Sequence, residues 1–324
     1  MSGILVISLD FELHWGAFEK RPIELWENYY RQTRVLIPGL LNIFSTHEIS
    51  ATWATVGLLM HSNREELLQD WPGQEPAYHD PALSPYQYIR KTGIGENEHD
   101  DPFHYGAALV KQIHETPGQE IGTHTFGHYY CNEAGQTLEQ FREDLRSAVK
   151  AAQRLNIDLK SLVFPRNQCN DKYLEVCGEQ GIIAVRTNPD VWFWRIHTRE
   201  EPMYKRICRG ADAYWPLGSA RNRYFHDRLH SENMPLMIPA SRVLRPDDPK
   251  EYFLNTWKRR RIFNEMEAAA RENSIYHLWW HPHNFGHHPE ENLTLTTDIC
   301  RHARTLGMQS LSMGQLACFI RSGS

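Results

Sequence analysis

The chain has 324 residues, of which 41% are hydrophobic, and its formal net charge is −5. This length and hydrophobic content allow one large barrel-like domain or two smaller domains. The negative balance excludes the broadly basic surface of a nucleic-acid-binding protein. Residues 195–261 nevertheless hold 15 Lys and Arg against 8 Asp and Glu, so this basic stretch carries +7. Such an excess is either a solvated face or attracts an anionic substrate.

The cysteines and the chain start indicate the compartment. The six cysteines form no CxxC pair and no regular spacing, which predicts reduced structural thiols rather than a zinc knuckle or a disulfide framework. The first residues show no basic leader with a cleavage site. No stretch approaches the roughly 20 apolar residues that span a bilayer, so we expect no transmembrane segment. These features predict a soluble cytoplasmic protein.

Apolar runs and amphipathic periods alternate along the chain. A capping box formed by Thr137 and Gln140 begins the clearest helix, and Pro38 predicts a kink or break in the first helix. The predicted strands cover residues 4–7, 51–60, 120–126, 161–164, 182–186, 236–238, 274–280 and a segment near 310. The predicted helices cover residues 24–47, 103–114, 137–155, 171–181, 248–271 and 289–304, followed by a last short helix.

Two long stretches without a sustained period, residues 61–102 and 188–241, interrupt this alternation, and we interpret both as loop excursions. No internal repeat and no convincing linker divides the chain, so we expect a single domain over residues 1–324. Six or seven strands that alternate with helices predict an α/β fold, one parallel barrel with decorated loops. In such barrels the C-terminal strand ends carry the chemistry.

Asp10 and Glu12 follow the first apolar run, where a core strand meets solvent. Alternation along a strand places both carboxylates on the same side, so both reach one pocket. They predict a metal site with a base beside it, and the alternative is a surface pair or a helix cap.

His124 and His128 lie in GTHTFGH, a glycine-containing turn after a predicted strand. With 18 histidines in the chain, the four-residue spacing alone is weak, and two polar turn histidines are the alternative. Two imidazoles and one carboxylate nevertheless make a facial metal site with open positions.

Polar residues also follow two other predicted strands. Arg166 and Asn167 come directly after Phe164 and Pro165, and an arginine there orients a carboxylate or only bridges loops. In WWHPHN, His281 and His283 follow an apolar run, and either serves as an acid or packs within a loop. Trp15, Trp192 and Trp194 are candidates for stacking on a sugar ring, as an alternative to packing.

Taken together, these motifs resemble the polysaccharide deacetylase family, the NodB homology domain of carbohydrate esterases. SLDFE is similar to the first motif of the family, THTFGH to the second, FPRN to the third and LWWHPHN to the last. The four occur in the family's order and span residues 8–284. Many members have two adjacent aspartates where this chain has Asp10 and Glu12, and the surroundings of Arg166 depart from the usual third motif.

The resemblance implies a distorted (β/α)7 barrel and a role for each motif. It makes Asp10 the general base, Arg166 the residue that positions it, and His281 the general acid, with His283 still open for that role. The implied metal ligands are Glu12, His124 and His128, for one divalent ion, Zn²⁺ first and Co²⁺, Ni²⁺ or Fe²⁺ as alternatives. The implied substrate-binding residues are Trp15, His14, Asn167 and His283.

These features predict a metal-dependent hydrolase that removes an acetyl or other acyl group from an amino sugar. The cytoplasmic expectation and the basic stretch favour a nucleotide- or lipid-linked intermediate of surface polysaccharide biosynthesis. One alternative is another C–N hydrolase on the same scaffold, such as a deformylase or a ureide-type amidase. A phosphoesterase with paired metals and a non-catalytic sugar-binding protein are the more distant alternatives.

Overall fold

A computed structural model describes residues 3–195, 198–215, 217 and 234–322 of the chain. Its centre is a single sheet of nine strands, all paired in parallel, in the order β6-β5-β4-β3-β2-β1-β8-β7, with β9 beside the first half of β1. The strands are β1 Ile4–Phe11, β2 Ala51–Thr55, β3 Gln119–Thr123, β4 Ser161–Val163, β5 Ala184–Thr187, β6 Leu236–Pro239, β7 Arg242–Val243, β8 Ile275–Trp280 and β9 Gln309–Leu311.

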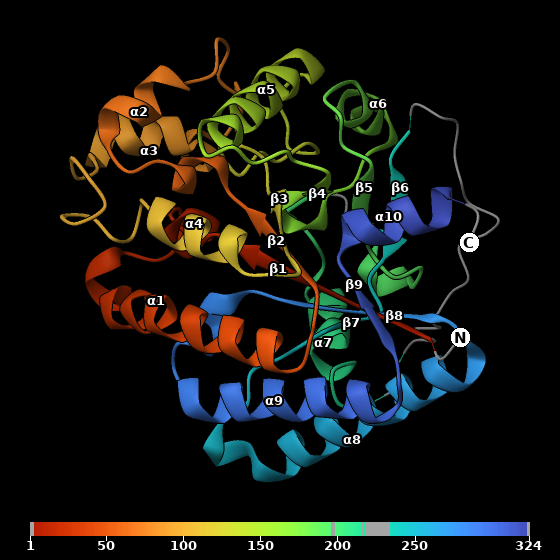
Figure 1. The fold of residues 1–324 in the computed structure, drawn as a ribbon. Helices are drawn as coiled ribbons and strands as arrows, with labels where there is room; N and C mark the ends of the chain where they lie inside the picture. Colours follow the sequence, from red (N-terminus) through yellow and green to blue (C-terminus); the bar gives the residue numbers. More distant parts are fainter. Residues whose placement is uncertain (1–2, 196–197, 216, 218–233, 323–324) are drawn as a thin grey trace.

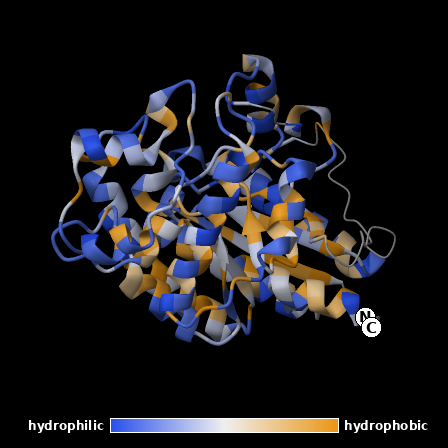
Figure 2. Ribbon diagram, turned by 90° about the horizontal axis from the view of Figure 1, so that it is seen from above, coloured by the Kyte–Doolittle hydropathy of each residue, from blue (hydrophilic) through white to orange (hydrophobic). Residues whose placement is uncertain are grey.

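Helices surround this sheet (Figure 1), and the strands at its centre are mostly apolar (Figure 2). The parallel α/β barrel predicted from the alternation of elements, and expected from the resemblance to be distorted, is confirmed, and of its strands only β7 lies outside the predicted set. The helices are α1 Ile23–Thr46, α2 Arg64–Gln69, α3 Pro85–Thr92, α4 Ala107–Glu115, α5 Leu138–Arg154, α6 Asp171–Glu179, α7 Met203–Ala211, α8 Tyr252–Glu272, α9 Pro289–Thr305 and α10 Met313–Arg321.

Strands β6 and β7 lie at opposite edges of the sheet although only Ala240 and Ser241 separate them in the chain. The Ala240 amide donates to the Thr187 carbonyl of β5, over 2.8 Å. The Ser241 amide donates to the His277 carbonyl of β8, also over 2.8 Å. These two adjacent residues therefore bond to the strands next to the two edges, and they connect the edge strands through the main chain.

Local sequence signals account for several helix boundaries. Thr137 and Gln140 form the predicted capping box of α5, and Ser312 and Gln315 form a second one at α10. Helix α1 continues through Pro38 without the expected break, because buried side chains on both sides of the proline hold it against the sheet. Tertiary packing outweighs the local cost of the proline here.

The two predicted excursions contain short helices, α2 and α3 in residues 61–102 and α7 in residues 188–241. Part of the second excursion lies outside the described residues. All six cysteines are free, in agreement with the sequence. Among the described residues, no helix has both the length and the apolar character that crossing a bilayer requires.

Candidate active site

The first carboxylates lie where β1 ends. Asp10 belongs to β1, whose last four residues pair with β2, and Glu12 follows the strand directly. The chain then turns at Leu13, whose φ of 46° is left-handed, into a short 3-10 helix that ends at Gly16. Both carboxylates are almost fully buried, with 2% and 4% of their surface exposed. Two acidic groups thus lie at the C-terminal end of β1, in the interior of the barrel.

The histidine motif follows β3, the second strand along the sheet from β1. His124 comes directly after the strand, and the turn then uses left-handed conformations at Thr125 and His128, with φ values of 63° and 55°. Asp144 of α5 accepts the Phe126 and Gly127 amides over 2.7 and 3.0 Å. A buried carboxylate on a neighbouring helix therefore fixes the turn that aims both imidazoles.

Both imidazoles point at the Glu12 carboxylate. His124 Nε2 lies 3.0 Å from Glu12 Oε1, and His128 Nε2 lies 3.1 Å from the same oxygen. All three residues are buried, and one ligand atom from each falls within 4.8 Å of the others. Burial alone would raise the pKa of Glu12, but the facing histidines, His281 the strongest, hold it well below its usual value.

This cluster fits a divalent cation. His124 donates its Nδ1–H to the Val163 carbonyl over 2.8 Å, because a carbonyl oxygen can only accept. In the neutral ring, Nε2 then carries a lone pair that is buried, has no hydrogen-bond partner and faces a carboxylate oxygen. Two acceptors this close repel each other unless a positive charge, a metal ion or a proton on Nε2, lies between them. Two imidazole nitrogens and one carboxylate oxygen are a donor set that zinc and related ions prefer.

Asp10 is held by an arginine that the sequence reasoning did not identify. Arg186 of β5 donates two bonds of 2.7 Å, one to each carboxylate oxygen of Asp10. It also donates to Ser8 Oγ over 3.0 Å and to Asn167 Oδ1 over 2.9 Å. Burial alone would raise the pKa of Asp10, but Arg186 and two nearby histidines outweigh burial and lower it.

The expected partnership of Arg166 with Asp10 is wrong. Arg166 pairs instead with Glu19, and its guanidinium lies 4.2 Å from the Tyr130 ring centre. Its backbone is left-handed, with a φ of 53°, in the short turn Pro165–Asn167. The available signal for Arg186 was a charged residue inside the buried strand Ala184–Thr187, because a buried charge requires a partner.

His281 follows β8 and faces both carboxylates. Its Nε2 lies 3.7 Å from Asp10 Oδ2 and 3.6 Å from Glu12 Oε1, while its side chain keeps 26% exposure. His283 lies behind it, with the two ring centres 5.1 Å apart. Burial, reinforced by the neighbouring His281, lowers the pKa of His283 to about 3. The geometry therefore favours His281 over His283 for proton transfer.

The remaining predicted substrate-binding residues lie elsewhere. Trp15 is fully buried and donates its Nε1–H to the His104 carbonyl, so it has no face for a sugar ring. His14 is also buried, between His104 and the carbonyl of Arg21. Asn167 supports Arg186 from the edge of the site. Trp192 is half exposed, and Trp194 lines the adjoining cavity.

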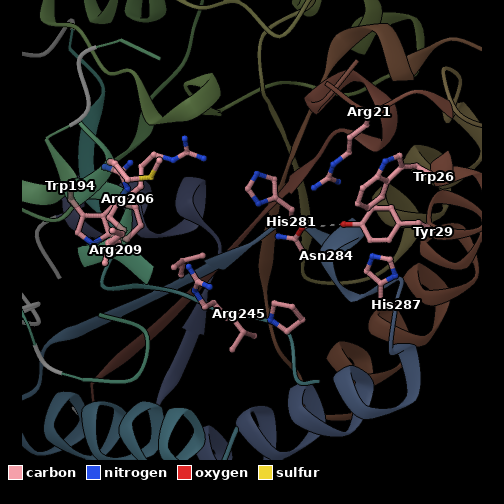
Figure 3. A pocket seen from close by; sticks show the side chains of 15 residues that line it. Arg21, Trp26, Tyr29, Trp194, Arg206, Arg209, Arg245, His281, Asn284 and His287 are labelled. Carbon is pink, nitrogen blue, oxygen red and sulfur yellow. Dashed lines mark hydrogen bonds between the residues drawn. The ribbon is translucent and has the colours of Figure 1, made fainter. Parts of the chain in front are cut away.

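A cavity of about 760 Å³ opens beside His281. Figure 3 shows His281 between two groups of side chains, one around Trp26 and Tyr29 of α1 and one around Trp194 and α7. Tyr29 donates its hydroxyl to Asn284 Oδ1 over 3.2 Å. This volume is typical of small-molecule sites, and it places His281 where a bound ligand reaches it.

The chain resembles known proteins in its fold but not in its sequence. No protein-family model and no curated protein matches the chain. A putative polysaccharide deacetylase from Mycobacterium smegmatis superposes with a TM-score of 0.61 and 12% identity, over 100% of this chain and 92% of that one. The chain has the polysaccharide deacetylase fold. The fold thus agrees with the family that the four motifs resemble. At 12% identity this likeness concerns the fold and not the activity.

Two other solved structures share this fold, and their names state different activities. Puue allantoinase superposes with a TM-score of 0.52 and 11% identity, over 98% of this chain and 88% of that one. A 4-alpha-glucanotransferase from Thermococcus litoralis gives 0.50 and 14%, over 99% of this chain but only 38% of that one. The polysaccharide deacetylase fold is therefore compatible with several chemistries, and the activity has to be inferred from the residues of the site.

Proposed function

We propose that this protein is a metal-dependent amidohydrolase that removes an acetyl or other acyl group from an N-acylated amino sugar. The observation that carries the proposal is the buried convergence of Glu12, His124 and His128 on one point, next to Asp10 and His281. The shared polysaccharide deacetylase fold supports it.

The metal would be held by Glu12, His124 and His128. Each imidazole is oriented by a contact at its other ring nitrogen. His124 Nδ1 donates to the Val163 carbonyl, and His128 Nδ1 lies 2.9 Å from the Tyr130 hydroxyl. When bound, a divalent ion supplies Lewis acidity toward an acyl carbonyl and a neighbouring water. Zinc heads the candidates, with cobalt, nickel and iron as alternatives that share this donor set.

Asp10 is the group that accepts a proton from water. Arg186 occupies one lone pair on each carboxylate oxygen, which leaves the other lone pairs free to accept. The lowered pKa keeps Asp10 ionised at neutral pH, as a base must be. Arg186 and Asn167 fix the orientation of the carboxylate without touching the substrate.

His281 is the group that donates a proton to the departing amine. An amine leaves poorly unless it is protonated as the C–N bond breaks. His281 is the partly exposed member of the cluster, so it meets both the buried carboxylates and the cavity. The proposed acid and base are close neighbours, since His281 Nε2 lies 3.7 Å from Asp10 Oδ2.

A ureide-type amidase is the second candidate, because Puue allantoinase has the same fold over nearly the whole chain. The same base, acid and ligands serve hydrolysis of a cyclic ureide, so the site alone does not separate the two. The two activities differ in the shape of their substrates, so a direct comparison of ureides with acylated sugars distinguishes them. Deformylation of an amino sugar differs only in the acyl group released.

The test is a mass-spectrometric screen of the recombinant protein loaded separately with zinc, cobalt or nickel. The panel contains N-acetylated oligosaccharides, acetylated and formylated nucleotide sugars, and allantoin. We expect loss of acetyl or formyl from a sugar. Turnover of allantoin alone would replace the proposal with the ureide amidase, and no turnover with any metal would favour a non-catalytic sugar-binding protein.

The ligand assignment has its own test. His124→Ala and His128→Ala each remove one ligand, so we expect bound metal and activity to fall together, metal affinity by roughly 10-fold or more. His114→Ala on the exposed face of α4 is the matched control and should keep both. Metal content is measured by elemental mass spectrometry after dialysis. Full occupancy in both ligand variants would refute the assignment.

A further inference from the structure

The cavity beside His281 is strongly cationic. Four arginines line it, and none of its 15 lining residues is an aspartate or glutamate. Figure 3 shows Arg21 on one side of the cavity, Arg206 and Arg209 on the opposite side, and Arg245 between them. The arginines therefore surround one space and do not simply project from one solvated face.

Three of the four arginines have no carboxylate partner within the described part of the chain. Arg209 is the exception, since it donates to Glu201 Oε2 over 2.5 Å and to the Phe193 carbonyl over 2.7 Å. Arg21, Arg206 and Arg245 form no ion pair with any described residue. The structure thus leaves about three positive charges uncompensated around one cavity.

Two of these arginines also have buried donors without an acceptor. Arg21 Nη1 and Arg245 Nε are both inaccessible to solvent and make no hydrogen bond to the described residues. Arg21 is held in place by stacking, its guanidinium 4.2 Å from the Trp26 ring centre and 5.5 Å from that of Tyr29. Tyrosine hydroxyls also lie beside both guanidinium groups, those of Tyr29 and Tyr30 beside Arg21 and that of Tyr214 beside Arg245, but a neutral hydroxyl does not compensate the positive charge.

We infer that this cavity binds a phosphoryl or pyrophosphoryl group carried by the substrate. Guanidinium groups match phosphate oxygens in geometry and charge, and several of them around one cavity suit a group with charge on many oxygens. The cavity also has room for a sugar ring next to His281. The inference rests on the proposed function for the sugar, and it makes the substrate a phosphate-linked N-acyl amino sugar.

Binding is tested with probes that carry no acyl group and so cannot be deacylated. Titration calorimetry of the metal-loaded protein compares glucose 1-phosphate, UDP-glucose, glucuronate and methyl glucoside. We expect the two phosphate compounds to bind and methyl glucoside to bind at least 10-fold more weakly. Equal binding of methyl glucoside, or tighter binding of glucuronate than of either phosphate, would overturn the inference.

Variants connect the binding to the arginines. Arg245→Ala and Arg206→Glu should each weaken binding of UDP-glucose about ten- to hundredfold, because charged hydrogen bonds are lost. Arg260→Ala, on an exposed position of α8 away from the cavity, is the matched control and should bind normally. Unchanged binding in both cavity variants would overturn the assignment, whatever the activity.

Two arms identify the carrier of the phosphate. Binding of UDP-glucose more tightly than glucose 1-phosphate indicates a nucleotide-linked substrate. Binding of a polyprenyl-phosphate sugar in detergent micelles more tightly than either indicates a lipid-linked one. A protein that binds the phosphates but deacylates nothing would retain this site and refute the proposed function. Deacylation of neutral oligosaccharides by a protein that binds no phosphate would support the proposed function and overturn the phosphate-binding inference.

Discussion

The ion pair between Asp10 and Arg186 determines the charge state of the proposed base. Both side chains are buried, and each oxygen of Asp10 accepts one 2.7 Å bond. Burial without Arg186 would favour the protonated acid, which cannot accept a proton. Arg186 is thus a positioning residue whose effect is read in the pH dependence of the reaction.

We expect Arg186→Gln to move the acidic limb of the pH profile of kcat/KM upward. The folded pKa of Asp10 lies below its ordinary value because of Arg186, so removal of that charge raises the pKa. Activity that requires ionised Asp10 is then lost at a higher pH than in the wild type. The measurement is kcat/KM from pH 4 to 9.

Arg166→Gln is the control for this experiment, because Arg166 pairs with Glu19 and not with Asp10. It should leave the acidic limb in place. A profile that shifts in Arg166→Gln and stays unchanged in Arg186→Gln would return the positioning role to Arg166. Metal content should remain full in both variants, which separates this effect from the loss of a ligand.

At the scale of elements, the short 3-10 helix Leu13–Gly16 packs its last residue against Glu12. A Cβ at Gly16 would lie 1.7 Å from Glu12 Oε2 and 2.5 Å from the carboxyl carbon. Glu12 is buried and its Oε1 lies 3.0 and 3.1 Å from two imidazole nitrogens, so a carboxylate that shifts away from a new methyl group loses this placement. A residue that touches no metal therefore sets the position of a proposed ligand.

We expect Gly16→Ala to lose metal to an extent similar to His128→Ala, although it alters no ligand. Circular dichroism should show an intact fold, and elemental analysis should show a depleted site. Gly106→Ala is the matched control, because its new methyl group meets no atom closer than 3.5 Å. Full metal occupancy in Gly16→Ala would show that Glu12 adapts or is not a ligand.

At the scale of the whole molecule, closure of the barrel depends on Ala240 and Ser241. Besides the main-chain bonds to β5 and β8, Ser241 Oγ accepts the His277 amide over 3.0 Å. The His277 ring in turn lies 2.9 Å from Ser8 Oγ, on the strand that carries Asp10. The closing residues and the site are therefore joined by consecutive hydrogen bonds.

We expect Ser241→Ala to lower the free energy of unfolding by about 1–3 kcal/mol, because the buried His277 amide loses its acceptor. Urea unfolding followed by tryptophan fluorescence gives the value. Ser62→Ala, at an exposed position, should change stability by less than about 0.5 kcal/mol. Equal stability of both variants would mean that water replaces the Ser241 hydroxyl.

Most of the barrel and of the metal cluster was predictable, because both follow from local pattern. Buried parallel strands appear as apolar runs, and their polar C-terminal neighbours meet at one edge. The sequence marked Arg186 only as a charge inside a buried strand, and spacing did not show whether Arg186 of β5 or Arg166 after β4 reaches Asp10. Trp15 was misassigned because an aromatic residue beside a motif looks the same whether it packs or stacks.

The cationic cavity is assembled from four stretches that are remote in the chain, around residues 21–29, 194–209, 243–246 and 281–287. An unfolded chain holds no such cavity, so a phosphate ligand binds the closed barrel alone. Its binding free energy then adds to the stability of the fold, by about 2.7 kcal/mol at a ligand concentration 100 times its Kd. In a cell that contains its substrate, the protein would be more resistant to unfolding than in buffer.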